Sequence, residues 1–123
     1  MAKDHAAKEK AIMEYLGFSW IRDQKWDGEG TAFDGEEWYC EAKSANLPGG
    51  CKGIWRILDE AWAQILERMA QQDAQGHALV AYVPTHTASA DGLAMFVCRG
   101  QRVVMPLRKF RERYITGAEE AGQ

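Results

Sequence analysis

Residues 29–44 have the sequence EGTAFDGEEWYCEAKS, and this stretch decides the fold. Its middle contains Asp34-Gly35, a pair that favours a two-residue β-turn. Glycine, and aspartate more than most residues, tolerate the positive φ that such turns need. The stretch therefore predicts a β-hairpin, and its second arm, 36–44, is the longer one.

The second arm separates apolar from charged side chains. Successive side chains of a strand point to opposite faces. One face carries an apolar set that suits a core: Trp38, Cys40 and Ala42. The other face carries Glu41 and Lys43, together with Tyr39. A glutamate and a lysine are rarely buried unless they are paired or bound to something, so this face predicts a functional site.

The first arm brings further carboxylates to that face. With a two-residue turn Gly28 lies opposite Glu41, and with a connection one or two residues longer Glu29 does. Asp27 and Glu29 share one face, which the hairpin brings beside Glu41. Hard cations such as Mg²⁺ bind one or two carboxylates together with waters and substrate phosphates. The cluster therefore predicts a Mg²⁺ or Mn²⁺ site, in which Lys43 orients an attacking water or balances phosphate charge.

An acid, a hairpin and then 41–43 (EAK) resemble the active-site motif of the PD-(D/E)XK nucleases. The surroundings resemble the small Holliday-junction-resolvase-like members of phages and archaea. A helix that ends at 16–18 (LGF) precedes the motif, and a helix that opens at 53–56 (GIWR) follows it. The chain closes with 103–107 (VVMPL) and a basic helix. The resemblance covers roughly the whole chain, and the E-x-K motif is its sharp element.

This resemblance implies a restriction-endonuclease-like fold, with helices flanking a mixed central sheet. It implies an endonuclease that needs Mg²⁺ or Mn²⁺ and hydrolyses phosphodiester bonds of DNA, selectively on branched structures. Two coordinated cuts need two sites, so a homodimer is expected. Glu41 and the Ala42 carbonyl oxygen are the implied metal ligands, together with an acid of the first arm.

The chain departs from the family pattern at that first acid. The family usually has an aspartate near the start of the first arm, a place that falls here at 30–31 (GT). Glu29 is the best geometric substitute and Asp27 the next, whereas Asp34 is more simply a turn residue. Both Glu29 and Asp27 therefore join the candidate catalytic and metal-binding residues.

Two predicted helices bear on the site. The first, 4–16, carries Glu9 on its apolar stripe. Many resolvase-like members aim a glutamate of this helix at the metal; the alternative is a Glu at the frayed edge of the stripe, paired with a lysine. The second, 54–72, leaves Arg68 among the residues that point mostly outward. Gln64 lies at the edge of its stripe, where family members carry a glutamine that faces the site; a solvated glutamine is the alternative.

The remaining segments predict one α/β domain over the whole chain. Residues 18–24 predict a first strand, and the apolar runs 77–83 and 93–98 predict buried strands. A short strand, 103–105, leads into the closing helix. We expect 117–123 to be a disordered tail.

Several basic residues are candidates for contacts with a DNA backbone. They are Arg22, Lys52, Arg56, Arg108, Lys109 and Arg111. Solvated charged surface is the alternative for the strand edge and for the closing helix, and an ordinary linker is the alternative for 45–53. The net charge of −3 argues against unspecific nucleic-acid binding over the whole surface but leaves room for a local basic patch.

The composition predicts an ordinary soluble protein. The chain has 123 residues, 46% of them hydrophobic and 27% charged, which suffices for one core. No apolar run is long enough to cross a bilayer and no signal peptide is visible, so we expect a cytoplasmic protein. The three cysteines lack the spacing of a disulfide framework or a zinc site.

Two other functions remain open on the sequence. The first is a non-catalytic nucleic-acid-binding or protein-interaction module that keeps the nuclease fold, which the shifted acid and the acidic balance favour. The second is a small structural or regulatory protein that binds no nucleic acid.

Overall fold

A single mixed sheet organises the computed structural model, which describes residues 2–21, 25–46 and 51–117. Its six strands follow one another in sequence order across the sheet. They are β1 Ser19–Trp20, β2 Gly28–Thr31, β3 Glu37–Lys43, β4 His77–Tyr82, β5 Leu93–Cys98 and β6 Gln101–Pro106. Strands β3 and β4 pair in parallel, and the other neighbouring pairs are antiparallel. The α/β class with a mixed sheet is thus confirmed.

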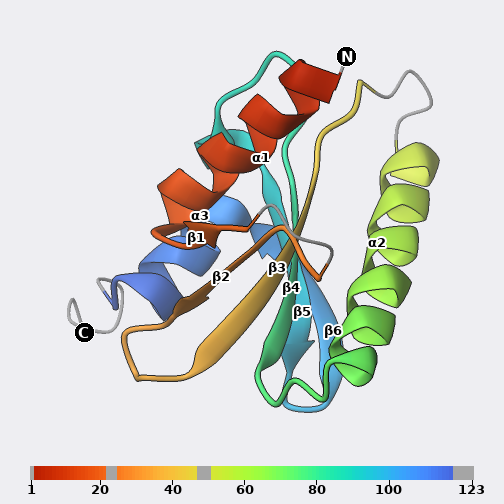
Figure 1. The fold of residues 1–123 in the computed structure, drawn as a ribbon. Helices are drawn as coiled ribbons and strands as arrows, with labels where there is room; N and C mark the ends of the chain where they lie inside the picture. Colours follow the sequence, from red (N-terminus) through yellow and green to blue (C-terminus); the bar gives the residue numbers. More distant parts are fainter. Residues whose placement is uncertain (1, 22–24, 47–50, 118–123) are drawn as a thin grey trace.

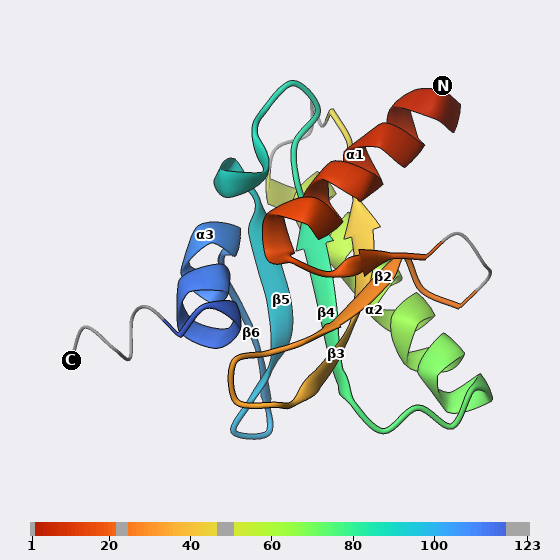
Figure 2. The same cartoon turned by 60° about the vertical axis from the view of Figure 1, so that its left-hand side comes forward.

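Helices cover both faces of this sheet. They are α1 Ala2–Leu16, α2 Cys51–Gln71, the 3-10 helix η1 Ser89–Asp91, α3 Leu107–Phe110 and the π-helical η2 Arg111–Ile115. Helices α1 and α3 pack on one face and α2 on the other (Figure 1). The turned view of Figure 2 brings α1 and α3 forward and leaves α2 behind the strands. Helix α2 joins β3 to β4, because two parallel strands need a crossover connection.

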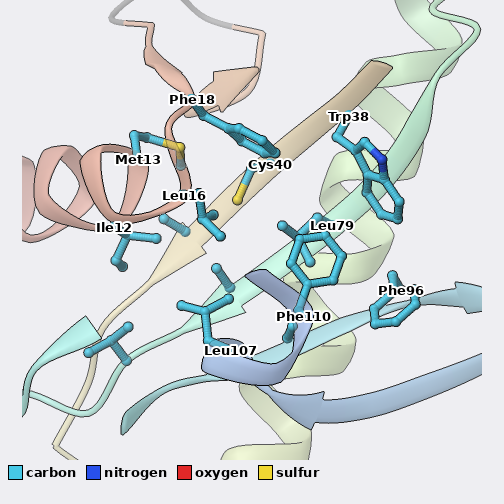
Figure 3. Close-up of a cluster of buried hydrophobic side chains, with 14 of the residues drawn as sticks. Ile12, Met13, Leu16, Phe18, Trp38, Cys40, Leu79, Phe96, Leu107 and Phe110 are labelled. Carbon is cyan, nitrogen blue, oxygen red and sulfur yellow. The ribbon is translucent and has the colours of Figure 1, made fainter. Parts of the chain in front are cut away.

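One hydrophobic core fills the space between the sheet and helices α1 and α3 (Figure 3). Its centre is aromatic: the rings of Trp38 and Phe110 lie 5.0 Å apart, and those of Phe96 and Phe110 lie 5.1 Å apart. Cys40 and Ala42 of β3 are buried in the same core. The apolar face predicted for the second hairpin arm is therefore confirmed.

A second core lies between the sheet and α2. The predicted apolar stripe of this helix is confirmed, since Leu58, Ala61 and Ile65 are buried against the sheet. Strand β4 contributes Val80 to this core and Leu79 to the other one. After the exposed His77, its residues are buried on both faces, which explains why the rest of the run 77–83 is apolar.

The hairpin forms, but its turn differs from the prediction. The connecting loop is Phe33–Gly35, one residue longer than a two-residue turn, because Ala32 and Glu36 close it through an Ala32 N–H bond to the Glu36 carbonyl at 2.8 Å. Gly35 adopts φ +89°, and the Asp34 carboxylate accepts the Glu36 N–H at 3.0 Å. A three-residue loop with a left-handed last residue is a common hairpin connection.

Several predicted boundaries were also wrong. Strand β1 covers Ser19–Trp20 and excludes residues 18 and 21 of the predicted 18–24, whereas 22–24 lie outside the described residues. Helix α2 starts three residues early, so Gly53 is helical, and β6 extends beyond 103–105 on both sides. Gly117 is buried, and the rest of the predicted tail lies outside the described residues. Within the ranges described above, no helix combines the length and apolar character needed to cross a bilayer.

Candidate functional site

The hairpin register brings Asp27, not Glu29, beside Glu41. Gly28 pairs with Cys40 and Glu29 with Tyr39, so the predicted pairing of Glu41 with Gly28 or Glu29 is wrong. The extra loop residue moves the register by one position toward Asp27. The Asp27 N–H donates to the Cys40 carbonyl at 3.0 Å, and the Asp27 carboxylate accepts the Ala42 N–H at 2.8 Å.

Glu41 is a charged side chain in the second core. It is only 2% exposed and lies on the face of β3 that α2 covers. Its carboxylate contacts Arg68 of α2, with the guanidinium nitrogen Nη1 at 3.2 Å from Oε1 and 3.5 Å from Oε2. The Lys43 ammonium lies 3.6 Å from Oε2. Burial with cationic partners is the arrangement that a buried glutamate requires.

Gln64 completes the contacts of Glu41. In the amide orientation that satisfies both of its ends, its nitrogen donates to Glu41 Oε2 at 2.8 Å and its oxygen accepts from Arg68 Nη2 at 2.7 Å. Gln64 and Arg68 are four positions apart on α2, so they share one side of that helix. Gln64 therefore contacts the acid instead of being a solvated glutamine, which was the other interpretation of its position. The outward orientation expected for Arg68 is wrong. Its position four residues after Gln64 was the signal available in the sequence.

Burial raises the pKa of both carboxylates, and the charge of Asp27 also acts on Glu41. Burial first, and then the negative charge of Asp27, raise the pKa of Glu41 from 4.5 to about 7. Lys43 and Arg68 oppose this shift. Burial likewise raises the pKa of Asp27, against the Ala42 N–H, Lys43 and Arg68, which lower it. Such shifts arise where acids are held together at partial burial, and they mark candidate functional sites.

Lys43 lies between two small pockets at the end of β3. One, of about 170 Å³, is lined by Lys43 and Ser44 together with Glu9 and Ile12 of α1 and Ala42. Glu9 and Lys43 thus line the same pocket, whereas the Glu41 carboxylate faces α2 on the other side of the sheet. A role of Glu9 at the metal stays a prediction.

The other pocket, of about 180 Å³, lies on the α2 side of β3. Lys43 and Ser44 line it together with Ala45 and, from α2, Ile57, Glu60, Ala61 and Gln64. Among the described residues, the Ser44 hydroxyl is the buried side-chain polar atom that lacks a hydrogen-bond partner. Ser44 therefore presents a buried polar group where both pockets meet Lys43, a signal that sequence reasoning missed.

Glu29 lies away from this cluster. Its carboxylate accepts a hydrogen bond from the Trp26 indole N–H at 2.8 Å, and the Trp26 ring packs on Tyr39 with centroids 4.4 Å apart. The register places Glu29 opposite Tyr39, which lies two positions before Glu41 on β3. The place beside Glu41 for which Glu29 was preferred to Asp27 was therefore wrong.

The candidate basic residues divide between the two faces of the molecule. Lys52 and Arg56 are exposed in the first turns of α2, and Arg56 pairs with Glu60 at 3.2 Å. Arg108 and Lys109 are exposed on α3, which packs on the face of the sheet opposite α2 (Figure 1).

Two further basic candidates differ from these. Arg111 is tied down: its guanidinium donates to the Tyr15 carbonyl at 2.7 Å and lies 5.0 Å from the centre of the Tyr15 ring. These contacts join η2 to α1. The role of Arg111 as a DNA contact stays a prediction. Arg22 lies outside the described residues.

The donor set is compatible with a hard divalent cation. Asp27 and Glu41 supply carboxylate oxygens, and two carboxylates are what Mg²⁺ typically takes from a protein. The N–H and C=O of a strand residue point toward the same neighbouring strand. The Ala42 carbonyl therefore lies on the edge where its N–H meets Asp27. Across the described ranges, no group of three or more His, Cys, Asp or Glu side chains is arranged to hold a metal ion.

No family model matches the chain, and neither a curated protein nor a solved structure matches it. The function is therefore inferred from the site itself.

Proposed function

We propose that this chain is a metal-dependent endonuclease that hydrolyses phosphodiester bonds of DNA, with a restriction-endonuclease-like arrangement of its elements. The observation that carries the proposal is the meeting of Asp27 and Glu41 beside Lys43 on one face of β3. The succession of α1, β1, the β2–β3 hairpin and α2 supports it, because the resemblance predicts a helix, a hairpin with the E-x-K strand, and a helix.

Asp27, Glu41 and the Ala42 carbonyl are the groups that would hold Mg²⁺ or Mn²⁺. The ion, when bound, lowers the pKa of a water and neutralises charge on the phosphate. The Lys43 side chain is 37% exposed, so it reaches solvent while remaining close to Glu41. It can therefore hold the attacking water or a phosphate oxygen. Gln64 fixes the orientation of the Glu41 carboxylate through its amide.

The substrate and assembly follow from the resemblance. A resolvase-like enzyme cuts branched, four-way DNA and acts as a homodimer, because paired cuts need two sites. Cleavage of a labelled four-way junction beside linear duplex of the same sequence, with Mg²⁺ and with EDTA, tests both. We expect metal-dependent cutting of the junction alone. Cutting of both DNAs would retain the nuclease and reject the resolvase, and a monomer by light scattering at the assay concentration would reject the homodimer.

The decisive variant is Lys43→Ala. Loss of a group that positions or deprotonates the water lowers the cleavage rate by about 10²- to 10⁴-fold, with the fold intact by circular dichroism. Lys10→Ala is the matched control, because this exposed lysine of α1 packs over the Trp20 ring and belongs to no candidate site. Equal cutting by the Lys43→Ala variant and the parent would refute the mechanism.

The second candidate is a non-catalytic nucleic-acid-binding or protein-interaction module. The contacts of Glu41 with Arg68, Lys43 and Gln64 favour it, because they satisfy the carboxylate without a metal. Millimolar Mg²⁺ separates the candidates, since an ion that binds only the folded state raises its melting temperature. A rise supports the nuclease; no rise with or without DNA, together with retained DNA binding, supports the module.

A further inference from the structure

Arg68 forms an ion pair with Glu41, the carboxylate that the proposed nuclease would use to bind its metal. Its guanidinium nitrogen Nη1 lies within hydrogen-bonding distance of both Glu41 oxygens, at 3.2 and 3.5 Å. Gln64 bridges the same pair: its amide nitrogen donates to Glu41 and its amide oxygen accepts from Arg68. These contacts fix the Arg68 guanidinium against Glu41, so Arg68 belongs to the cluster.

The fully ionised cluster is electrically neutral before any ion is added. Asp27 and Glu41, when both are ionised, carry two negative charges, and Lys43 and Arg68 carry two positive ones. A divalent cation that enters alone meets a neutral cluster and must compete with the guanidinium for Glu41. A cation that enters together with a phosphodiester brings its own anion, to which a displaced guanidinium can transfer, because arginine binds phosphate oxygens through the same planar fork.

We propose that Arg68 is a positioning residue that couples the two ligands: it leaves Glu41 for a DNA phosphate when the metal binds, so that metal and DNA bind cooperatively. This inference rests on the proposed nuclease function and deepens it. The Arg68 side chain is 32% exposed, so part of it is already open to the solvent from which a phosphate would arrive. Coupling of this kind is reciprocal, and the metal must strengthen DNA binding by the same factor.

The test measures metal binding without catalysis. Isothermal titration of Ca²⁺, an oxygen-binding cation, is carried out with and without a short duplex DNA, and DNA is titrated with and without Ca²⁺. For the parent we expect each ligand to lower the Kd of the other by about tenfold, within the range typical of coupled sites. For Arg68→Gln we expect Ca²⁺ alone to bind about tenfold more tightly than to the parent, with little remaining coupling.

Arg102→Gln is the matched control. Arg102 pairs with Asp59 of α2 at 3.0 Å, so this variant removes the same charge and also breaks an ion pair to α2, away from the acids. We expect it to keep the parent's coupling. If Arg68→Gln fails to fold because Glu41 loses its partner, Arg68→Lys takes its place. A lysine keeps the charge but loses the fork, so Ca²⁺ alone should bind several-fold more tightly than to the parent.

The outcomes separate this inference from the function beneath it. Coupling that disappears only in the Arg68 variants supports the inference. Metal binding that is equal in the parent and the Arg68 variants, with or without DNA, overturns the role of Arg68 and leaves the nuclease standing. Failure of every protein to bind the cation under any condition overturns both.

Discussion

At the scale of the residue, Glu41 ties stability to pH. Its pKa rises from 4.5 in an unfolded chain to about 7 in the folded protein, so the folded state binds the extra proton. The stabilisation is complete below pH 4.5 and is lost as the pH rises through 7, a loss on the order of 3 kcal/mol. The raised pKa of Asp27 acts in the same direction.

We therefore expect Glu41→Gln to become more stable relative to the parent as the pH rises from about 5 to about 8. Urea unfolding at several pH values measures the difference in free energy of unfolding. Glu67→Gln, on the exposed side of α2, should show no such trend. A parent and a Glu41→Gln variant with parallel pH profiles would show that Glu41 titrates normally.

The Ser44 hydroxyl is expected to lower the stability of the protein and to assist DNA cleavage. A buried hydroxyl without a partner costs stability, so Ser44→Ala should leave the free energy of unfolding unchanged or raise it by up to about 1 kcal/mol. Because Ser44 lines both pockets beside Lys43, the same variant should cleave DNA several-fold more slowly. Ser19→Ala, at an exposed position, is the control. A clear loss of stability in Ser44→Ala would mean that the hydroxyl has a structural partner.

At the scale of the element, Arg111 joins η2 to α1. The Tyr15 carbonyl belongs to the last turn of α1, where carbonyl groups have no partner within the helix. Arg111→Ala should therefore lower the free energy of unfolding by about 2 kcal/mol, the size of a charge-assisted hydrogen bond. Arg108→Ala, one turn earlier and exposed, should change it by less than about 0.5 kcal/mol. Equal effects of the two variants on thermal unfolding would contradict this role.

The sequence predicted the elements of the site better than their register. Alternation along β3 correctly separated Glu41 and Lys43 from Trp38 and Cys40, because one face is apolar and the other charged. The choice between Asp27 and Glu29 depended on a single residue in the loop. Asp34-Gly35 fits both a two-residue and a three-residue connection, so local propensity does not decide between them.

Contacts between distant elements were the least predictable part. Arg68 lies 27 positions after Glu41, and its side of α2 looked solvent-facing because charged residues usually do. The Arg111 contact with Tyr15 spans 96 positions and joins a helix to a π-helical turn that no local pattern announces. Both contacts depend on how helices dock on the sheet, which periodicity within one helix does not fix.

At the scale of the whole molecule, the sheet separates the acids from the basic helix. Lys52 and Arg56 belong to α2, on the same face as Glu41, whereas Arg108 and Lys109 lie on the opposite face. DNA that reaches Lys43 should therefore depend on the first pair more than on the second.

Paired charge reversals measure this dependence. We expect the double variant Lys52→Glu, Arg56→Glu to bind DNA more weakly. The slope of the logarithm of its binding constant against the logarithm of salt concentration should fall in magnitude by roughly one for each phosphate that it no longer binds. Arg108→Glu with Lys109→Glu should have the smaller effect on both. Stabilisation by Ca²⁺ alone verifies that each variant keeps its site. The opposite ranking would place the DNA on the α1 and α3 face, away from the acids.

From the connection of β3 to β4 through α2 we also expect an order of events during folding. A hairpin brings Asp27 and Glu41 together, and we expect it to form early because it closes a short loop. Arg68 reaches Glu41 only when α2 docks and β3 pairs with β4, which closes a longer loop. The nascent hairpin therefore holds two carboxylates side by side before their guanidinium partner is in place. Protons or divalent ions that relieve this repulsion should act on the rate of folding as well as on the finished structure.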